Sequence, residues 1–305
     1  MGMKVITAAV LASLKIGFNK AFTDGLAMAP SAWQKVATEI KSNSAVNLYG
    51  WMNNIPKMRE WVGDRVLNVL KTSGYSLANK KFEDSIGVAR EDIEDDNVGM
   101  YTPLFTELGR TSNEHIDESV FALLKANGDC FDGQNFFDVD HPIYGINGTT
   151  ETVLGTYSNA DIDSATPTAL RWYLLDCSRP LKPLIYQNRL DAKLTSMDNE
   201  ADEGVFMRDE YRHGVRARRA FGYGLPQLAF ASNKTLNADN YAKAKAAMAN
   251  QVTDNNRKLG VRPTILVVPP QLEAAAKALI KAETINGTTN IHRDDVEILV
   301  TPFVS

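Results

Sequence analysis

The stretch with the greatest potential for chemistry is residues 138–142, which read Asp-Val-Asp-His-Pro. Two carboxylates and an imidazole within four residues could hold a metal ion or act as general acid and base. A metal site needs further ligands, and the other histidines stand at no spacing that would supply them. Because Asp and Pro favour turns through side-chain-to-backbone bonds, we expect the segment to form a turn. A metal-assisted hydrolase built on Asp138, Asp140 and His141 is the alternative.

A second cluster is acidic, with five carboxylic acids among residues 91–96. A calcium loop that began at Asp92 would need glycine at its sixth position and glutamate at its twelfth. The chain has Asn97 and Pro103 at those positions, so the calcium pattern fails. We expect instead a solvated or salt-bridged acidic segment before a helix, where negative charge suits the helix dipole.

A basic cluster follows later in the chain. Its members are Arg208, Arg212, Arg216, Arg218 and Arg219. Neighbouring aromatic residues make a nucleic-acid contact conceivable. The whole chain carries 33 basic and 37 acidic side chains, a net charge of −4, whereas dedicated nucleic-acid-binding domains are usually strongly basic. We therefore expect these arginines to form ion pairs within or between subunits, and contact with duplex DNA to be weak.

Motifs of the common enzyme classes are missing from the sequence. There is no Walker sequence, no G-x-S-x-G and no H-E-x-x-H, and the glycines at 222 and 224 are not followed by the third glycine of a dinucleotide fingerprint. Cys130 and Cys177 lie far apart and are expected in the core, which fits a reducing cytoplasm. The sequence argues weakly against an enzyme, and we predict no catalytic, metal-binding or cofactor-binding residue.

Two segments near the N-terminus differ in character. Apolar residues recur every four positions between Ile6 and Phe22, which predicts an amphipathic helix and not a signal peptide. No apolar run approaches 18 residues, so no membrane span is expected. Residues 44–90 instead show strand-like alternation with glycines between. Their faces are too polar for a core of their own, so we expect them to be ordered by packing on another subunit.

The remaining elements follow local signals. Thr102 is expected to cap a long helix near 103–127 that Gly128 ends, and residues 129–165 are expected to be loop. Strands are expected at 172–175, 183–187 and 215–231. From Leu236 onward, a helix capped by Asn237, a strand, a helix and a strand form a compact α/β unit.

Tryptophan placement points to contacts between subunits. Three of the four tryptophans lie within the first 61 residues, in the part of the chain with the least core of its own. Interface cores favour Trp, Tyr, Met and Arg. The predicted intersubunit contacts are Trp33, Trp51, Trp61, Arg208, Arg212, Arg216 and Arg218.

Taken in order, these elements resemble the major head subunits of Mu-like bacteriophages, a branch of the Hong Kong 97-type capsid proteins, over essentially the whole chain. None of the stretches that carry the resemblance is a generic motif. They are Asn47-Leu48-Tyr49-Gly50-Trp51, Gly74-Tyr75-Ser76-Leu77-Ala78-Asn79-Lys80, residues 90–97, Asp132-Gly133-Gln134-Asn135-Phe136-Phe137, residues 138–142, Lys182-Pro183-Leu184-Ile185-Tyr186-Gln187, residues 222–229 and Leu266-Val267-Val268-Pro269-Pro270.

The resemblance implies an α+β fold with four parts. These are an N-terminal arm (1–43), an extended β loop (44–90), a peripheral domain (91–235) with a spine helix near 103–127, and an α/β axial domain (236–305). Part of 150–235 is left open between the last two.

The implied function is that of a major capsid protein, which self-assembles into the icosahedral head shell of a tailed Mu-like bacteriophage or prophage. Pentamers and hexamers of the chain would enclose double-stranded DNA, with scaffolding and prohead protease proteins taking part in assembly. The expected location is the virion capsid, assembled in the cytoplasm of the bacterial host.

Overall fold

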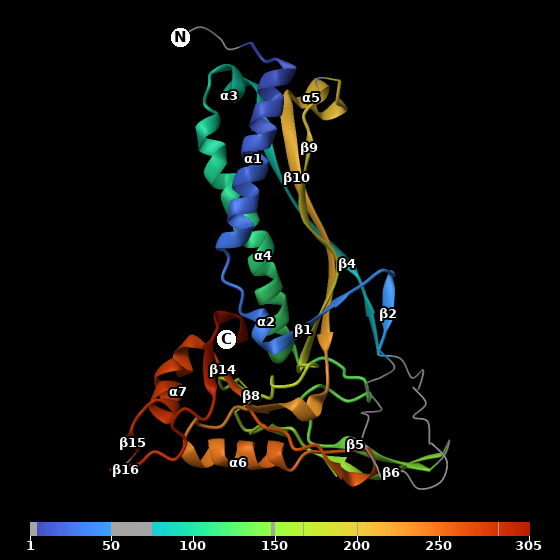
Figure 1. Ribbon diagram of the computed structural model, residues 1–305, viewed down its shortest axis with the longest axis vertical. Coiled ribbons are helices and arrows are strands. Elements are labelled where there is room, and N and C mark those ends of the chain that lie inside the picture. The colour runs from blue at the N-terminus through green and yellow to red at the C-terminus, as the bar shows by residue number, and fades with distance from the viewer. Residues whose placement is uncertain (1–4, 50–74, 148–149, 167, 200, 286) are drawn as a thin grey trace.

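Two β-sheets organise the chain, and helices cover both (Figure 1). The structure is a computed structural model that describes residues 5–49, 75–147, 150–166, 168–199, 201–285 and 287–305. One sheet has four long strands in the order β1-β9-β10-β4, and the other has five short strands in the order β17-β14-β8-β11-β7. This mixture of helices and separate sheets confirms the predicted α+β class.

The four-stranded sheet is built on one long antiparallel hairpin. Its strands are β9 (Leu184–Met197) and β10 (Glu210–Tyr223), joined through the short helix α5 (Glu203–Arg208). On one side β4 (Lys80–Ala89) pairs antiparallel with β10, and on the other β1 (Ala37–Lys41) pairs parallel with β9. Residues 80–89 are therefore ordered by their own chain. The expectation that all of 44–90 depends on another subunit is wrong for this strand, because it pairs with β10 over its whole length.

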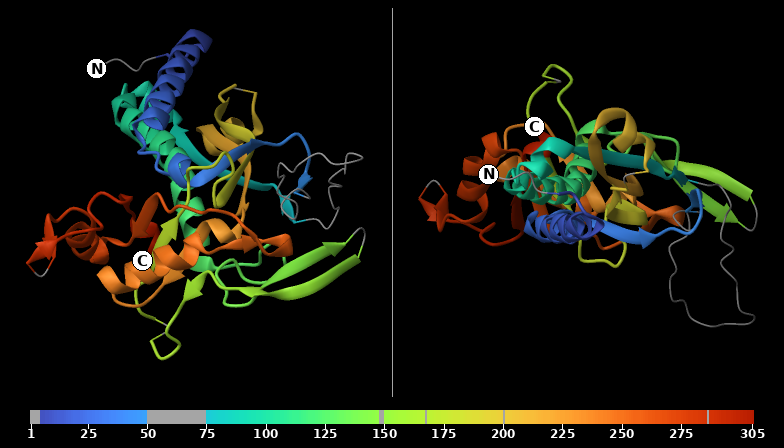
Figure 2. Two further views of the ribbon diagram at one scale, coloured as in Figure 1. Left: turned by 60° about the horizontal axis from the view of Figure 1, so that its bottom comes forward. Right: turned by 90° about the horizontal axis from the view of Figure 1, so that it is seen from above.

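Two long helices lie along one face of this sheet (Figures 1 and 2). They are α1 (Ala8–Met28) and α4 (Tyr101–Ala126). The apolar stripe expected near the N-terminus faces inward at Phe18 and Phe22, and the ring of Phe18 stacks on that of Phe105 with centroids 4.2 Å apart. The predicted arm helix and spine helix therefore share one core with the sheet.

The ends of α4 differ in detail from the prediction. A 3-10 turn, Val98–Met100, leads directly into the helix, so Thr102 lies inside the first turn and is not the N-cap. At the other end Asn127 takes the left-handed conformation (φ 47°) and closes the helix, one residue before the predicted Gly128. Asparagine tolerates this conformation because its short polar side chain bonds locally.

The two helices cross at a pair of glycines. A Cβ atom on Gly109 would lie 2.9 Å from the backbone nitrogen of Leu26 and closer still to the carbonyl oxygen of Phe22. A Cβ atom on Gly25 would lie 2.8 Å from the carbonyl carbon of Thr106. Backbone therefore packs against backbone at this crossing, which no larger residue allows.

The five-stranded sheet is buried on both faces. All residues of its strands β8 (Trp172–Leu175), β11 (Ala229–Ser232) and β14 (Ile265–Val268) are buried. Residues alternating along these strands pack on one face against α6 (Ala238–Ala249) and α7 (Glu273–Ile280), and on the other against the end of α4. Strands β7 (Ala160–Asp161) and β17 (Glu297–Val300) form its edges. Asn237 caps α6 as predicted, its side chain accepting the N–H of Asn240 at 2.9 Å.

Smaller elements complete the described chain. They are α2 (Trp33–Val36), α3 (Arg90–Glu94), β2 (Val46–Leu48) paired with β3 (Ser76–Ala78), β12 (Val252–Thr253) with β13 (Arg257–Lys258), β15 (Thr284–Ile285) with β16 (Thr288–Thr289), and the hairpin β5 (His141–Asn147) with β6 (Thr150–Tyr157). Among the described residues, no helix has the length and apolarity needed to cross a membrane.

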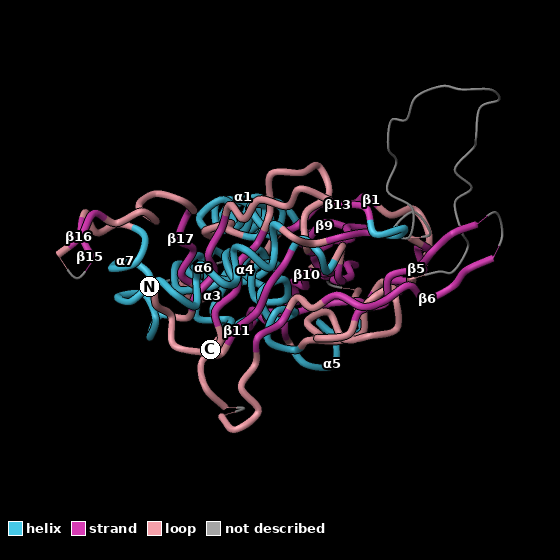
Figure 3. The backbone as a smooth tube through the Cα atoms, turned by 90° about the horizontal axis from the view of Figure 1, so that it is seen from below, coloured by secondary structure: helices cyan, strands magenta, loops and turns pink. Residues whose placement is uncertain are grey.

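Three expectations about the middle of the chain are corrected. Residues 129–165 are not all loop, because β5 and β6 form a hairpin that extends away from the rest of the molecule (Figure 3). The strand expected at 183–187 continues to Met197. The strand expected at 215–231 is two strands, β10 and β11, which belong to different sheets. The turn Pro226–Leu228 redirects the chain between them.

Candidate assembly surfaces

The segment 138–141 forms a turn that leads into β5. Oδ1 of Asp138 accepts the N–H of Val139 at 2.6 Å, and the N–H of Asp138 donates to Oδ1 of Asn159 at 2.8 Å. His141 is fully buried, and its Nδ1 lies 2.7 Å from Oδ2 of Asp132. These bonds use the polar groups to fix the chain, which is the arrangement expected of a turn.

Asp138 and Asp140 shift each other's pKa. Burial alone would raise the pKa of Asp138, but hydrogen bonds from Asp140 and Val139 lower it. The bond to Asp138 raises the pKa of Asp140. In the part of the chain that the structure describes, no group of three or more acids, histidines or cysteines is placed to hold a metal ion.

The acidic segment before α4 is largely solvated, as predicted. Glu91 and Asp95 are exposed on and after α3. Asp92 accepts a hydrogen bond from the hydroxyl of Tyr101 at 2.6 Å, which ties α3 to the first residue of α4. The segment therefore presents negative charge on a fixed frame.

Three of the predicted arginines lie along one strand. The alternation of β10 directs Tyr211, His213 and Val215 into the core, so Arg212 and Arg216 face away from α4. Arg216 stands opposite Glu83 of β4 and Lys193 of β9, and Arg218 stands opposite Lys81. The outer face of the long sheet is therefore rich in positive charge.

Ion pairing within the chain accounts for little of this charge. Nε of Arg212 lies 3.4 Å from Oε2 of Glu210. Across the described ranges, no carboxylate lies within 4.0 Å of Arg208, Arg216 or Arg218. Of the two kinds of ion pair expected for these arginines, the intramolecular kind is formed, within the described residues, only at Arg212.

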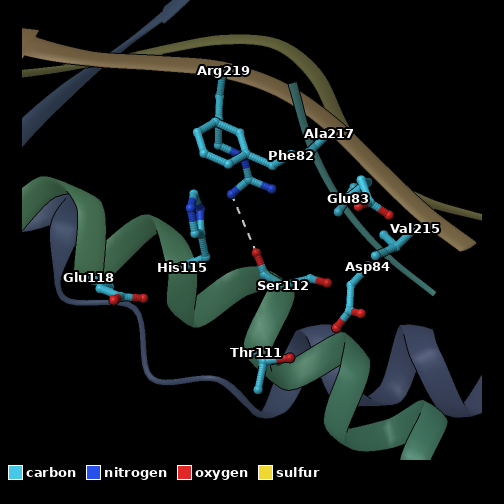
Figure 4. A pocket seen from close by; sticks show the side chains of 11 residues that line it. Phe82, Glu83, Asp84, Thr111, Ser112, His115, Glu118, Val215, Ala217 and Arg219 are labelled. Carbon is cyan, nitrogen blue, oxygen red and sulfur yellow. Dashed lines mark hydrogen bonds between the residues drawn. The ribbon is translucent and has the colours of Figure 1, made fainter. Parts of the chain in front are cut away.

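Arg219 does not belong to the outer row, which Arg212, Arg216 and Arg218 form on the outer face of the long sheet. Arg219 stands an even number of residues after Tyr211, His213 and Val215 on β10, so the same alternation points its side chain inward, where it is 3% exposed. It enters a cavity of about 320 Å³ between α4 and the sheet (Figure 4). Its Nη1 donates to the carbonyl oxygen of Ser112 at 3.3 Å, and its Nε is buried without a partner in the described structure.

The same cavity holds His115, whose ring lies 4.4 Å from that of Phe82. Burial, and then the nearby charge of Arg219, lower the pKa of His115 to about 4. The histidine is therefore neutral at physiological pH. The basic cluster seen in the sequence thus divides into an outer row and one buried guanidinium beside a neutral imidazole.

Trp33 is part of the core of its own chain. It is 7% exposed, and its ring meets that of Tyr186 edge-on at 4.8 Å. The carboxylate of Asp117 on α4 accepts the N–H groups of Ala32 and Trp33 at 3.0 and 2.8 Å, and burial is the main reason that its pKa is raised. The prediction of an intersubunit contact is wrong for Trp33, because the side chain is already covered.

The other two tryptophans named above, Trp51 and Trp61, lie outside the described residues. Cys130 is buried as expected, and burial raises the pKa of its thiol far above the usual range. Cys177 is partly buried, and burial raises the pKa of its thiol to about 12.

An exposed apolar pair that sequence reasoning missed lies on α5. Phe206 is 83% exposed and Met207 is 68% exposed, directly before the exposed Arg208. A second pair lies at the start of α4, where Met100 is 55% and Leu104 is 50% exposed. The signal for the first pair was present in the sequence, since two large apolar residues stand among charged ones at 203–210.

The chain matches one family and several known proteins. The model of the family "Mu-like prophage major head subunit gpT" matches residues 11–304. A Mu-like prophage FluMu major head subunit from Haemophilus influenzae is 45% identical over 285 residues, 92% of each chain. The major capsid protein of Escherichia phage Mu is 40% identical over 293 residues, 95% of each chain.

Solved structures give the same result. A chain of the procapsid of bacteriophage JBD30 has a TM-score of 0.85 at 48% identity, with 98% of this chain and 100% of that chain covered. A chain of the JBD30 capsid has a TM-score of 0.74 at 35% identity, with 99% and 100% covered. These matches confirm the predicted capsid fold and give the hydrolase alternative no support. The chain belongs to the family of major head subunits of Mu-like prophages.

Proposed function

We propose that this chain, a major capsid protein, builds the head shell through pentamers and hexamers that enclose double-stranded DNA. The observation that carries the proposal is the match to the JBD30 procapsid chain at a TM-score of 0.85, which extends over 98% of this chain. The described surface supports it, because exposed apolar pairs mark interaction sites and arginine is enriched at subunit interfaces.

The sheet to which each strand belongs suggests how the chain divides into arm, extended loop, peripheral domain and axial domain. We assign α1 and the residues up to 43 to the arm. Of the extended loop expected at 44–90, residues 50–74 lie outside the described residues, and β4 belongs to the long sheet, so we keep the loop for the residues before β4. The long sheet with α4 forms the peripheral domain, and the five-stranded sheet with α6 and α7 forms the axial domain. Residues 160–175 and 229–232 join the axial domain under this division, because β7, β8 and β11 lie in its sheet.

We further propose that Arg208, Arg212, Arg216 and Arg218 contact neighbouring subunits, together with Trp51 and Trp61. Three of these arginines have no carboxylate partner within the described chain, which supports pairing with another copy. Scaffolding and prohead protease proteins take part in assembly in the host cytoplasm. One related JBD30 capsid is decorated with minor capsid protein trimers, and a similar partner fits here.

Contact with DNA is proposed to be weak. The net charge of −4 opposes strong binding to a polyanion. Free subunits should therefore bind duplex DNA more weakly than micromolar at physiological salt. Each phosphate contact by the arginine row would add about 0.9 to the slope of log affinity against log salt concentration.

The test is assembly of the purified chain, followed by sedimentation and negative-stain microscopy. Closed shells support the proposal, whereas a small oligomer that never forms shells contradicts it. The double charge reversal Arg216→Glu with Arg218→Glu should leave a folded subunit that fails to assemble. Lys243→Glu, on the exposed side of α6, is the matched control and should assemble normally. If the double arginine variant assembled as well as the Lys243→Glu control, Arg216 and Arg218 would not be part of a subunit interface.

A further inference from the structure

The cavity between α4 and the long sheet contains a buried positive charge for which the described chain supplies no counterion. Arg219 of β10 is 3% exposed, and its guanidinium points across the cavity toward α4 (Figure 4). Among the described residues, no carboxylate lies within 4.0 Å of it. Buried charges in proteins are as a rule paired with an opposite charge. The cavity therefore lacks the anion that its guanidinium would bind.

Most of the N–H donors of this guanidinium are free. Nη1 donates to the carbonyl oxygen of Ser112 at 3.3 Å. Nε has no acceptor, and no hydrogen bond within the described chain involves Nη2. The planar fork of an arginine matches a carboxylate, which accepts two parallel N–H bonds from it. The free donors of Arg219 therefore fit one carboxylate group.

The cavity offers one positive charge and not two. His115 of α4 lines it, with its ring 4.4 Å from that of Phe82 and 6.0 Å from that of Phe221. Burial, and then the charge of Arg219, lower the pKa of this histidine to about 4, so the imidazole is neutral at physiological pH. A single cation balances the charge of a monocarboxylate, whereas it would leave a phosphate dianion half neutralised.

Three exposed acids also line the cavity, and they do not act as counterions of the buried guanidinium. These rim acids are Glu83, Asp84 and Glu118. The pKa of Arg219 is lowered, mainly because burial disfavours its charge, and the groups that raise it are Tyr186 and Asp191, which are not part of the lining. Exposed charges are screened by water and salt, whereas buried pairs are screened much less. The rim acids therefore oppose the entry of dianions without supplying the partner that Arg219 lacks.

The size and the walls of the cavity indicate what carries the carboxylate. Its volume of about 320 Å³ lies at the lower end of the range of small-molecule sites, roughly 300–1,000 Å³. Part of the lining is apolar, formed by Phe82, Ala192, Val215 and Ala217. A short hydrocarbon chain on the ligand would cover these groups from water. A neighbouring subunit would have to press its surface against the rim acids to insert a carboxylate, whereas a free molecule need not.

We propose that the cavity binds a small free monocarboxylate with a short apolar chain. Its carboxylate accepts hydrogen bonds from the guanidinium of Arg219, and its chain packs against Phe82 and Val215. Since α4 forms one wall of the cavity and strands of the long sheet form the other, an occupied cavity ties the spine helix more firmly to the sheet. The inference does not depend on the proposed function, because it concerns the free subunit.

The test measures binding of butyrate to the free subunit by ligand-detected NMR titration. Wild type should bind it with a dissociation constant of roughly 1–10 mM, as expected of a small ligand with one charged contact. Arg219→Met keeps much of the side-chain volume but removes the charge, and should weaken binding about tenfold or more. Arg216→Met is the matched control, because it makes the same change on the outer face of the sheet, and it should bind butyrate as wild type does. Equal affinity of wild type and Arg219→Met would overturn the inference.

A neutral analogue removes the charge from the ligand and leaves the protein unchanged. Butyramide has nearly the shape of butyrate and should bind wild type about tenfold more weakly, so this comparison decides the question even where Arg219→Met does not fold. In urea, butyrate should raise the unfolding midpoint of wild type and of Arg216→Met but not of Arg219→Met, since a ligand stabilises only a protein that binds it. Equal binding of butyrate and butyramide would contradict a site built on the guanidinium.

Shell assembly identifies the occupant of the cavity. Folded Arg219→Met should assemble as wild type does, because the ligand is a free molecule and not part of another subunit. If the folded variant lost assembly together with butyrate binding, the cavity would hold a carboxylate of a neighbouring subunit, and the inference of a free ligand would be wrong.

Discussion

Replacing Gly109 by alanine tests how closely the arm helix and the spine helix must approach. The new Cβ atom would lie 2.9 Å from the backbone nitrogen of Leu26, against an ordinary contact of about 3.5–4.0 Å. Helices α1 and α4 must therefore separate locally by roughly 1 Å, and a gap of that size forfeits about a quarter to a half of each dispersion contact across it. No rotamer change relieves the clash, because backbone atoms form the opposing surface.

The expected change in the free energy of unfolding follows from two opposing effects. Inserting a methyl group into a filled contact costs about 1–3 kcal/mol. The helix preference of alanine over glycine returns about 1 kcal/mol. We expect Gly109→Ala to lower the free energy of unfolding by up to about 2 kcal/mol, since the clash offsets or outweighs the helix preference.

Gly17 provides a matched control in the same helix pair. It lies on the exposed side of α1, and a Cβ atom there would meet nothing within 4 Å. Gly17→Ala should therefore raise the free energy of unfolding by about 0.5–1 kcal/mol. The assay is urea unfolding of the free subunit followed by circular dichroism. Equal stabilisation by both substitutions would show that α1 does not dock on α4, and would refute the reasoning.

Three further changes test buried polar groups, each by urea unfolding of the free subunit. Asp117→Ala leaves the buried N–H of Trp33 without its acceptor and should cost about 1–3 kcal/mol, whereas Asp117→Asn keeps an acceptor oxygen and should cost less. Arg219→Met removes a buried charge without a carboxylate partner and should change stability by less than about 1.5 kcal/mol or raise it, while Arg219→Ala opens a void and should lower it. The folded pKa of His115, about 4, lies below the ordinary 6.5, so its contribution to stability is present above pH 6.5 and is lost as pH falls toward 4. His115→Gln should make the unfolding midpoint less sensitive to pH in that window, and an unchanged slope would contradict the assignment.

Several elements could be predicted from the sequence because their signals are local. The spine helix expected near 103–127 is observed at 101–126, since its apolar period and stop signal lie within the segment itself. The strand 172–175 is reproduced without change, and Asn237 caps its helix. The helix and its cap depend on contacts between residues a few positions apart. The strand 172–175 is predicted because all four of its residues are large and apolar.

The candidate surfaces were only partly predictable. Alternation along β10 groups Arg212, Arg216 and Arg218 on one face and Arg219 on the other, but only the structure shows that the face with Arg219 packs against α4. Trp33 was expected at a subunit contact and is buried in its own chain, whereas the exposed Phe206 was not singled out from the sequence. Burial of a single aromatic residue depends on which distant segment reaches it, and residue type does not state that.

The sequence by itself therefore determined the helix and strand segments with strong local periodicity, the absence of common catalytic motifs, and the resemblance to a capsid family. Only the tertiary structure decided that 160–161, 172–175 and 229–232 join the sheet of the C-terminal segment, and that Gly109 is a point of backbone contact and not a weak place in a helix. The physical reason is that periodicity and caps act over a few residues. Sheet membership, register and close approach are instead set by packing between segments that lie 50 or more residues apart, such as β8 with β11 and Gly109 with Phe22.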